Sequence, residues 1–262
     1  MKIRVLGCHG SEQFGGEQSG LHQCRTCGFL INDTVMVDAG TIGAALTLEE
    51  QRAIRHILLS HLHFDHIQGL PTFGDNISEH AGQPVSLISI AEVLEGLQTH
   101  IFNDTVYPNF LKLPTLQQPV FECRVVAPGH PIQVAGLEVT AIRVNHLVPT
   151  VGFLIREGSS SILYSGDTYA TEEIWKVATQ EATLKAAFIE TSFPNDMEEL
   201  AFASRHLTPA LLDQELLKLG RPNVPVYLYH MKPRQRCEIE RDVRELRLKQ
   251  VSFLDEGQEI TI

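Results

Sequence analysis

The sequence lacks any apolar run long enough to cross a membrane, which argues against an integral membrane protein. Cysteine is scarce, with five residues spread unevenly along 262, so we expect a reducing cytoplasm and no disulfide framework. Positive charge is also in short supply, because 21 Lys and Arg against 32 Asp and Glu give a formal net charge of −11. Such a chain binds the nucleic-acid backbone poorly and suits a small-molecule substrate better than a polymer.

The N-terminus lacks the apolar region of a secretion signal. Residues 1–7 are instead predicted to form a strand, and we therefore expect a cytoplasmic protein without membrane association. No internal repeat, low-complexity tract or linker divides the sequence, which predicts a single domain over residues 1–262. The tract 103–119 is rich in proline and aromatic residues, and we expect it to form a lid or rim insertion around residues 90–120.

Apolar periodicity predicts alternating strands and helices, the pattern of an α/β fold. One helix is delimited clearly, because Thr208 can cap it, Pro209 suits its first position and Gly220 ends it. Strands are predicted at 3–6, 28–31, 34–37, 55–60, 84–88, 137–144, 151–155, 161–164, 186–189, 224–229 and 251–254, and helices at 47–55, 90–101, 209–219 and 238–248.

The segment 60–66, with the sequence SHLHFDH, concentrates metal-binding side chains. It follows a predicted buried strand and holds four potential ligands within six positions. In an extended loop, residues two apart face the same side, so His61 and His63 can grip one ion. Asp65 and His66 start a new direction and can address a second ion.

Further chelating side chains follow other predicted strands, namely His146, Asp167 and His230. Seven nitrogen and oxygen ligands, one a carboxylate able to bridge, suit two adjacent divalent ions with a shared position for hydroxide. Zinc is expected, and manganese or iron also suit all-N/O ligands. Asp38 ends a strand and can accept a hydrogen bond from a ligand imidazole, unless it serves only the local turn.

The order and spacing of these residues resemble the metallo-β-lactamase superfamily. The matching motifs are Asp38, HLHFDH at 61–66, His146, Asp167 in SGDT, and His230. The resemblance implies an αββα sandwich of two mixed sheets flanked by helices, with the metals at one edge. It also assigns His61, His63 and His146 to one ion, Asp65, His66 and His230 to the other, and Asp167 to both.

Within that superfamily the segments CGFLIND, SHLHFDHIQGLP, HIFND with YPNF, IETSFPN, HLTP and YHMKP are similar to class II 3′,5′-cyclic-nucleotide phosphodiesterases. The resemblance implies hydrolysis of a cyclic nucleotide such as cAMP or cGMP to a nucleoside 5′-monophosphate by a metal-bridging hydroxide. The related tRNA 3′-processing nucleases are often dimers, which favours a homodimer. They carry a Glu and His pair that Glu190 and His206 match in order.

We predict Asp65, Glu190 and His206 as catalytic residues. His206, oriented by Glu190, would donate a proton to the leaving 3′ oxygen. The alternative is a salt bridge at a helix start without a chemical role. Asn145 and Lys232 are candidates for binding phosphate or ribose.

Two further groups of side chains have open roles. Tyr107 and Phe110 can stack on a base or, equally, fill the local core. Cys24 and Cys27 form a CxxC pair near Cys8, His9 and His22; buried thiols are favoured over a structural zinc or redox pair, because no second CxxC accompanies them.

Rival functions on the same residues are a tRNA 3′ endonuclease and a lactone or thioester hydrolase. An iron-bound oxidoreductase is another alternative, although no flavin or second redox domain supports it. A non-catalytic nucleotide sensor is disfavoured, because a binding module has no need for an activated hydroxide.

Overall fold

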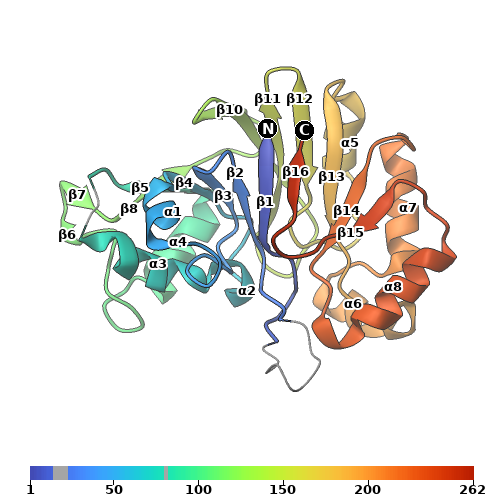
Figure 1. Cartoon of the computed structure of the whole chain (residues 1–262), viewed down its shortest axis with the longest axis horizontal. Helices are drawn as coiled ribbons and strands as arrows, with labels where there is room; N and C mark the ends of the chain where they lie inside the picture. The colour runs from blue at the N-terminus through green and yellow to red at the C-terminus, as the bar shows by residue number, and fades with distance from the viewer. Residues whose placement is uncertain (14–22, 80–81) are drawn as a thin grey trace.

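The computed structural model describes residues 1–13, 23–79 and 82–262. Two seven-stranded sheets pack face to face, with helices on both outer sides (Figure 1). The first sheet has the order β16 (Glu259–Thr261), β1 (Lys2–Gly7), β2 (Gly28–Ile31), β3 (Val35–Val37), β4 (His56–Leu58), β5 (Val85–Ser89) and β8 (Phe121–Val125). The second has the order β15 (Val251–Phe253), β14 (Val226–Tyr229), β13 (Leu184–Glu190), β12 (Ser160–Tyr164), β11 (Val151–Glu157), β10 (Leu137–Arg143) and β9 (Ile132–Val134).

Both sheets are mixed in the same way. In the first, the ladders from β16 to β3 are antiparallel and those from β3 to β8 are parallel. In the second, the ladders from β9 to β12 are antiparallel and those from β12 to β15 are parallel. Strands β10, β12, β13 and β14 therefore run in one direction, and their carboxyl ends meet at one edge of the sheet.

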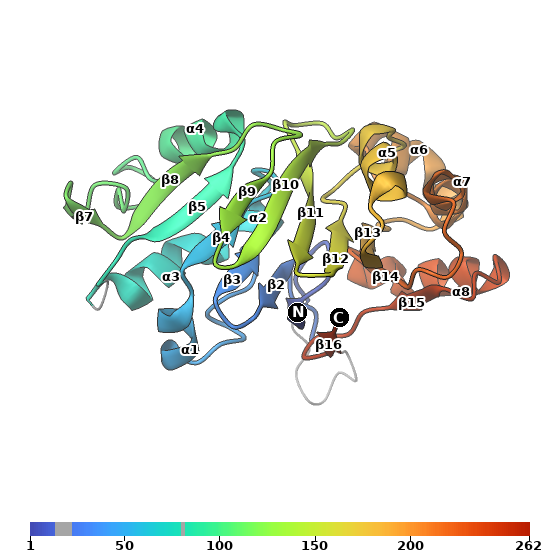
Figure 2. The same ribbon diagram turned by 90° about the horizontal axis from the view of Figure 1, so that it is seen from above.

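The helices divide into two groups, which Figures 1 and 2 place on opposite sides of the sandwich. On the side of the first sheet lie α1 (Leu48–Ala53), α3 (Gly69–Ser78) and α4 (Ala91–His100). On the side of the second lie α5 (Glu173–Gln180), α6 (Glu198–Ser204), α7 (Pro209–Leu219) and α8 (Arg236–Glu245). The shorter elements are α2 (Phe64–Ile67), η1 (Asn195–Met197), η2 (Pro233–Gln235), β6 (Pro114–Thr115) and β7 (Gln118–Pro119). None of the helices in the described part of the chain is long and apolar enough to cross a membrane.

The main core lies between the sheets and is organised around Phe29 of β2. Its ring makes edge contacts with Tyr164, Phe188 and Tyr229 of the opposite sheet, with centroids 5.5 to 5.9 Å apart. A second apolar cluster lies between the second sheet and its covering helices, with Trp175 and Leu212 among its buried members. Both sheets are therefore fixed by burial, and the loops at their common edge start from a rigid base.

Local sequence signals explain several element boundaries. Thr47 caps α1 in a capping box with Glu50, and Thr208 caps α7 by accepting from the Leu211 amide. Gly220 ends α7 with a φ of +63°, which glycine adopts without a steric penalty. The predicted strands and helices are confirmed in kind, whereas the elements that were not predicted are α2, α3, α5, α6, β6, β7, β8, β9, β16, η1 and η2.

Candidate metal centre

All seven predicted metal ligands lie at one end of the sandwich, on loops that follow strands. The segment after β4 carries His61 and His63, and α2 begins at Phe64 and carries Asp65 and His66. His146, Asp167 and His230 follow β10, β12 and β14, which all end at the same edge. Figure 1 shows α2 and α6 at this end of the molecule. The structure thus brings together side chains from four separate stretches of sequence.

One group of ligand atoms comes from His61, His63, His146 and Asp167, which all lie within 4.8 Å of one another. His63 Nδ1 lies 3.0 Å from His146 Nε2, and His61 Nε2 lies 3.6 Å from Asp167 Oδ2. Three imidazoles and one carboxylate at these separations are the donor set of a four-coordinate divalent ion.

A second group shares Asp167 with the first. Asp167 Oδ1 lies 3.3 Å from His66 Nε2, and Asp167 Oδ2 lies 3.2 Å from His230 Nε2. Asp65 Oδ2 is 3.1 Å from the same nitrogen of His230. Since one carboxylate faces both groups, the arrangement fits two ions that share Asp167.

The Asp38 carboxylate lies next to the cluster and accepts four hydrogen bonds. Its Oδ2 accepts from His66 Nδ1 at 2.7 Å, from Ser60 Oγ at 2.9 Å and from the Tyr164 hydroxyl at 2.6 Å. Its Oδ1 accepts from the Ser60 amide at 2.7 Å. Asp38 has a φ of +55°, an uncommon conformation for a residue other than glycine. Because Nδ1 of His66 is held, its Nε2 faces the cluster.

A second supporting network surrounds His206. His206 Nδ1 donates to Glu190 Oε1 at 2.8 Å, and both side chains are buried. The hydroxyl of Ser192 donates to Glu190 Oε2 at 2.9 Å and lies 2.8 Å from His230 Nδ1, from which it can accept. The His206 ring stacks on His230 at 5.1 Å and meets His146 at 5.0 Å. The Glu190 and His206 pair is therefore part of the same site.

Burial and mutual charge set the protonation of the cluster. Burial lowers the pKa of His61 well below its usual range, and burial together with His146 lowers the pKa of His63 to about 4. Burial opposes ionisation of Asp167, but the imidazoles of His230 and His66 outweigh it and hold the pKa of this carboxyl well below normal. His66 is the exception among the ligand imidazoles: burial lowers its pKa, but the carboxylates of Asp167 and Asp38 outweigh burial and raise the pKa well above normal. The ionised Asp167 and the neutral His61 and His63 are in the forms that bind cations, and a cation at His66 would replace its Nε2 proton.

The pKa of His206 shifts the other way. Burial lowers the pKa of His206, but the charge of the Glu190 carboxylate and the hydrogen bond to it, at 2.8 Å, together outweigh burial. The pKa of His206 therefore lies above its usual value. His206 thus differs from His146 and His230, whose pKa values burial lowers. The paired carboxylate explains the difference.

The hydrogen bonds of the donor atoms show whether a cation fits among them. Three of these atoms, His61 Nε2, His66 Nε2 and Asp167 Oδ1, are buried and form no well-aligned hydrogen bond among the described residues, although His66 Nε2 and Asp167 Oδ1 lie 3.3 Å apart. Buried polar atoms are normally paired, because leaving one unpaired costs about 1 to 3 kcal/mol. The residues present therefore fit divalent metal ions.

Cys27 lies unexpectedly close to the cluster. Its sulfur is within 4.8 Å of donor atoms of His66 and His230. Burial raises the pKa of this thiol well above normal, which favours the neutral thiol over the thiolate. Burial also raises the pKa values of Cys8 and Cys24, in agreement with the prediction of buried thiols. His22 lies outside the described residues.

The four predicted substrate contacts separate into two pairs. Lys232 Nζ lies 4.0 Å from Asp65 Oδ2 and donates to the Gly10 carbonyl, and Asn145 donates to the Ala170 carbonyl beside His146. Phe110, in contrast, is buried and packs against Phe102 and Phe121, so the stacking role was wrong for it. The Tyr107 hydroxyl donates to Asp75 of α3, and its ring packs on Phe110.

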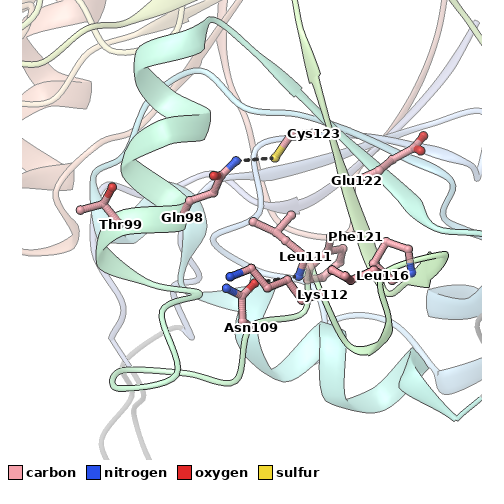
Figure 3. A pocket seen from close by; sticks show the side chains of 10 residues that line it. Gln98, Thr99, Asn109, Leu111, Lys112, Leu116, Phe121, Glu122 and Cys123 are labelled. Carbon is pink, nitrogen blue, oxygen red and sulfur yellow. Dashed lines mark hydrogen bonds between the residues drawn. The ribbon is translucent and has the colours of Figure 1, made fainter.

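The segment 90–120 lines a pocket of its own. This pocket, of about 550 Å³, lies between α4 and β8, where Gln98 donates to the Cys123 sulfur (Figure 3). Its lining includes none of the seven metal ligands, Glu190 or His206. The lid or rim role of residues around 90–120 therefore stays a prediction from the sequence.

A family model described as a beta-lactamase superfamily domain matches residues 33–248. The chain belongs to the metallo-β-lactamase superfamily. Among curated members, a probable 3′,5′-cyclic-nucleotide phosphodiesterase of Yersinia pestis is 27% identical over 235 residues, covering 81% of this chain and 65% of that protein. The 3′,5′-cyclic-nucleotide phosphodiesterase 1 of Saccharomyces cerevisiae is 24% identical over 245 residues, covering 82% and 65%. This member of the superfamily thus spans about two thirds of the length of both relatives.

Solved structures of the superfamily agree with the fold. Unliganded yeast PDE1 matches with a TM-score of 0.80 and 17% identity, covering 100% of this chain and 99% of that one. The short form of human tRNase Z matches with a TM-score of 0.71 and 17% identity, again covering 100% and 99%. The predicted αββα sandwich is confirmed; at these identities the likeness concerns the fold alone.

Proposed function

We propose that this chain is a metal-dependent phosphodiesterase that hydrolyses 3′,5′-cyclic nucleotides to nucleoside 5′-monophosphates. The observation that carries the proposal is the cluster around Asp167, where buried imidazole and carboxylate atoms face one another without well-aligned hydrogen bonds, next to the Glu190 and His206 pair. The curated relatives named as cyclic-nucleotide phosphodiesterases support the substrate class.

Two divalent ions, with zinc as the proposed metal, would occupy the two groups of donors. His61, His63 and His146 would hold one ion, Asp65, His66 and His230 the other, and Asp167 would serve both. When bound, such ions offset the charge of a phosphodiester and lower the pKa of water toward neutrality. The protein contributes the fixed positions: Asp38 and Ser192 hold Nδ1 of His66 and His230, which leaves Nε2 of each for the cluster.

His206 is the proposed general acid for the leaving 3′ oxygen. Its Nδ1 is committed to Glu190 at 2.8 Å, so Nε2 remains as the proton donor. Its ring lies against His146 and His230, one from each proposed metal group, which supports a role for His206 next to the reacting phosphate. Lys232, at 4.0 Å from Asp65, adds a positive charge at the cluster.

The decisive experiment pairs metal analysis with product identification. Protein loaded with zinc is incubated with cyclic AMP, GMP, CMP and UMP, and the products are separated by chromatography. We expect nucleoside 5′-monophosphates; 3′-monophosphates would contradict the assignment of the 3′ oxygen as leaving group. Parallel assays with bis(p-nitrophenyl) phosphate, a lactone and precursor tRNA test the rival hydrolases. Activity on a lactone or tRNA without activity on cyclic nucleotides would overturn the proposal.

A homodimer and a cytoplasmic location stay predictions from the sequence. Light scattering coupled to size-exclusion chromatography tests the first, with twice the chain mass of 29.2 kDa as the expected result. Fractionation of cells tests the second.

A further inference from the structure

An aromatic and cationic cluster outside the metal centre consists of Tyr169, Phe202 and Arg205. The rings of Tyr169 and Phe202 meet edge to face with centroids 5.6 Å apart. The Arg205 guanidinium lies over both rings, 4.7 Å from the centroid of Phe202 and 5.6 Å from that of Tyr169. We refer to these three residues as the aromatic platform.

The platform is built on the loops that carry the metal centre. Tyr169 follows Asp167 by two positions, and its amide donates to the Asn145 carbonyl at 2.8 Å, next to His146. Arg205 directly precedes His206, and its carbonyl accepts from His146 Nδ1 at 3.0 Å. Each contributing loop is therefore tied by hydrogen bonds to the backbone or ring of the His146 segment, which fixes the platform beside the site.

The aromatic platform is partly exposed to solvent and is therefore open to a ligand. Phe202 is 52% exposed, although it is a large apolar side chain on the short helix α6. Among residues 1–13, 23–79 and 82–262, no carboxylate forms an ion pair with Arg205. Leu147, which follows His146, is also exposed, at 59%. An apolar surface with an unpaired cation thus borders the metal centre on the side of His146 and His206.

Arg205 also occupies a position where the backbone alone would favour another residue. It ends α6 in the left-handed conformation with a φ of +59°, where glycine or asparagine is usually found. The guanidinium, however, is planar and stacks on aromatic faces, which neither of those residues can do. The Arg205 side chain therefore stacks on the two rings, a role that ending α6 does not require.

We propose that the aromatic platform stacks against the nucleobase of the substrate, an inference that rests on the function proposed above. A nucleobase is flat and has a π-face regardless of its identity, so rings and a guanidinium bind it without reading its edge. The cation also attracts a nucleotide into a chain with a net charge of −11. Larger purines bury more area than pyrimidines, so the platform favours cyclic AMP and GMP over cyclic CMP and UMP.

The test measures binding rather than turnover. Zinc-loaded protein is titrated calorimetrically with AMP and with ribose 5-phosphate, which has the same phosphate and sugar but no base. Base stacking contributes about tenfold in affinity, so AMP is expected to bind about tenfold more tightly. Phe202→Ala should remove most of this difference and leave the affinity for ribose 5-phosphate unchanged. Arg205→Lys, which keeps the charge but loses the plane, should remove part of it.

The matched control is Leu200→Ala, since Leu200 is exposed on the same helix, at 45%, but lies two positions from Phe202 and faces another direction. It should bind both ligands as the unaltered chain does. Phe202→Leu keeps apolar bulk and protects the test against misfolding of the alanine variant; it too should lose the base-dependent part.

Two results would overturn the platform. One is equal affinity of the unaltered protein for AMP and ribose 5-phosphate, and the other is an equal loss of both ligands in the Phe202 variants with metal content intact. A base-dependent difference in a protein that hydrolyses no cyclic nucleotide would refute the proposed reaction and leave the stacking surface standing.

Discussion

The metal centre and the segment 103–120 both carry side chains with predicted functions. In the structure they differ in whether the buried groups of these side chains have partners. At the metal centre, buried polar atoms such as His61 Nε2 and Asp167 Oδ1 form no well-aligned hydrogen bond among the described residues. In the segment, the ring of Phe110 is buried among other rings, and the hydroxyl of Tyr107 has a carboxylate partner. A functional site is recognised by what its buried groups still need, and the density of interesting side chains is a weaker guide.

The sharpest contrast is expected at Asp167, which faces both groups of donors. Asp167→Asn keeps the shape but removes the charge that serves both ions. We expect loss of bound metal and a fall in turnover of about 10³-fold or more, because ions supply several kcal/mol of charge stabilisation. Mass spectrometry of metal content and initial rates measure both. Asp33→Asn, at an exposed hairpin turn, is the control and should change neither.

His206 comes next, because it acts on a proton and is not among the seven proposed metal ligands. His206→Ala should lower turnover of cyclic nucleotides by about 10²- to 10⁴-fold with metal content intact. The loss should shrink on bis(p-nitrophenyl) phosphate, whose leaving group needs no proton. An equal loss on both substrates would contradict the role as acid. His130→Ala, at an exposed histidine, should have no effect.

Asp38 should have a smaller effect, because it acts through His66. Asp38→Asn suits the left-handed backbone but no longer accepts from His66 Nδ1 with a full charge. Loss of such a partner weakens metal affinity by about 10- to 100-fold. Competition with a chromogenic chelator measures this affinity. Turnover at saturating zinc should recover toward the unaltered rate; persistent inactivity would mean that Asp38 serves more than metal binding.

Much of the site could be predicted because ligands follow strands in a fixed order. Of the supporting side chains, Asp38 and Glu190 were predicted, but their hydrogen-bond partners were missed, because some of these are distant in the sequence: Tyr164 reaches Asp38 across 126 positions. Ser60 and Ser192 had a weak signal, as hydroxyls one and two positions from His61 and Glu190. No spacing in the sequence predicts that the Tyr164 hydroxyl donates to Asp38, which follows β3 in the other sheet.

The missed elements have physical explanations too. A proline is often found at the end of a helix, but Pro71 lies in the first turn of α3, where its missing N–H would have no partner in any case. β8 is an edge strand whose sequence FECRV does alternate between apolar and polar residues, so a signal for this strand was present and was overlooked. β9 and β16 have three residues each, too few for a period to show.

The smallest effect on catalysis is expected at Phe110, which the sequence offered as a base-stacking residue. Its ring lies directly over Gly74 of α3, where even an added Cβ would come within 2.4 Å of it, so the close fit depends on glycine. Phe110→Ala should leave a cavity and reduce the free energy of unfolding by about 3 to 5 kcal/mol. Urea denaturation measures this loss, and the folded variant should keep its turnover per bound metal. Leu116→Ala, 72% exposed in the same segment, should change stability by less than about 0.5 kcal/mol. A selective loss of cyclic-nucleotide binding in Phe110→Ala, with stability unchanged, would return this segment to the active site and undo the contrast between the two regions.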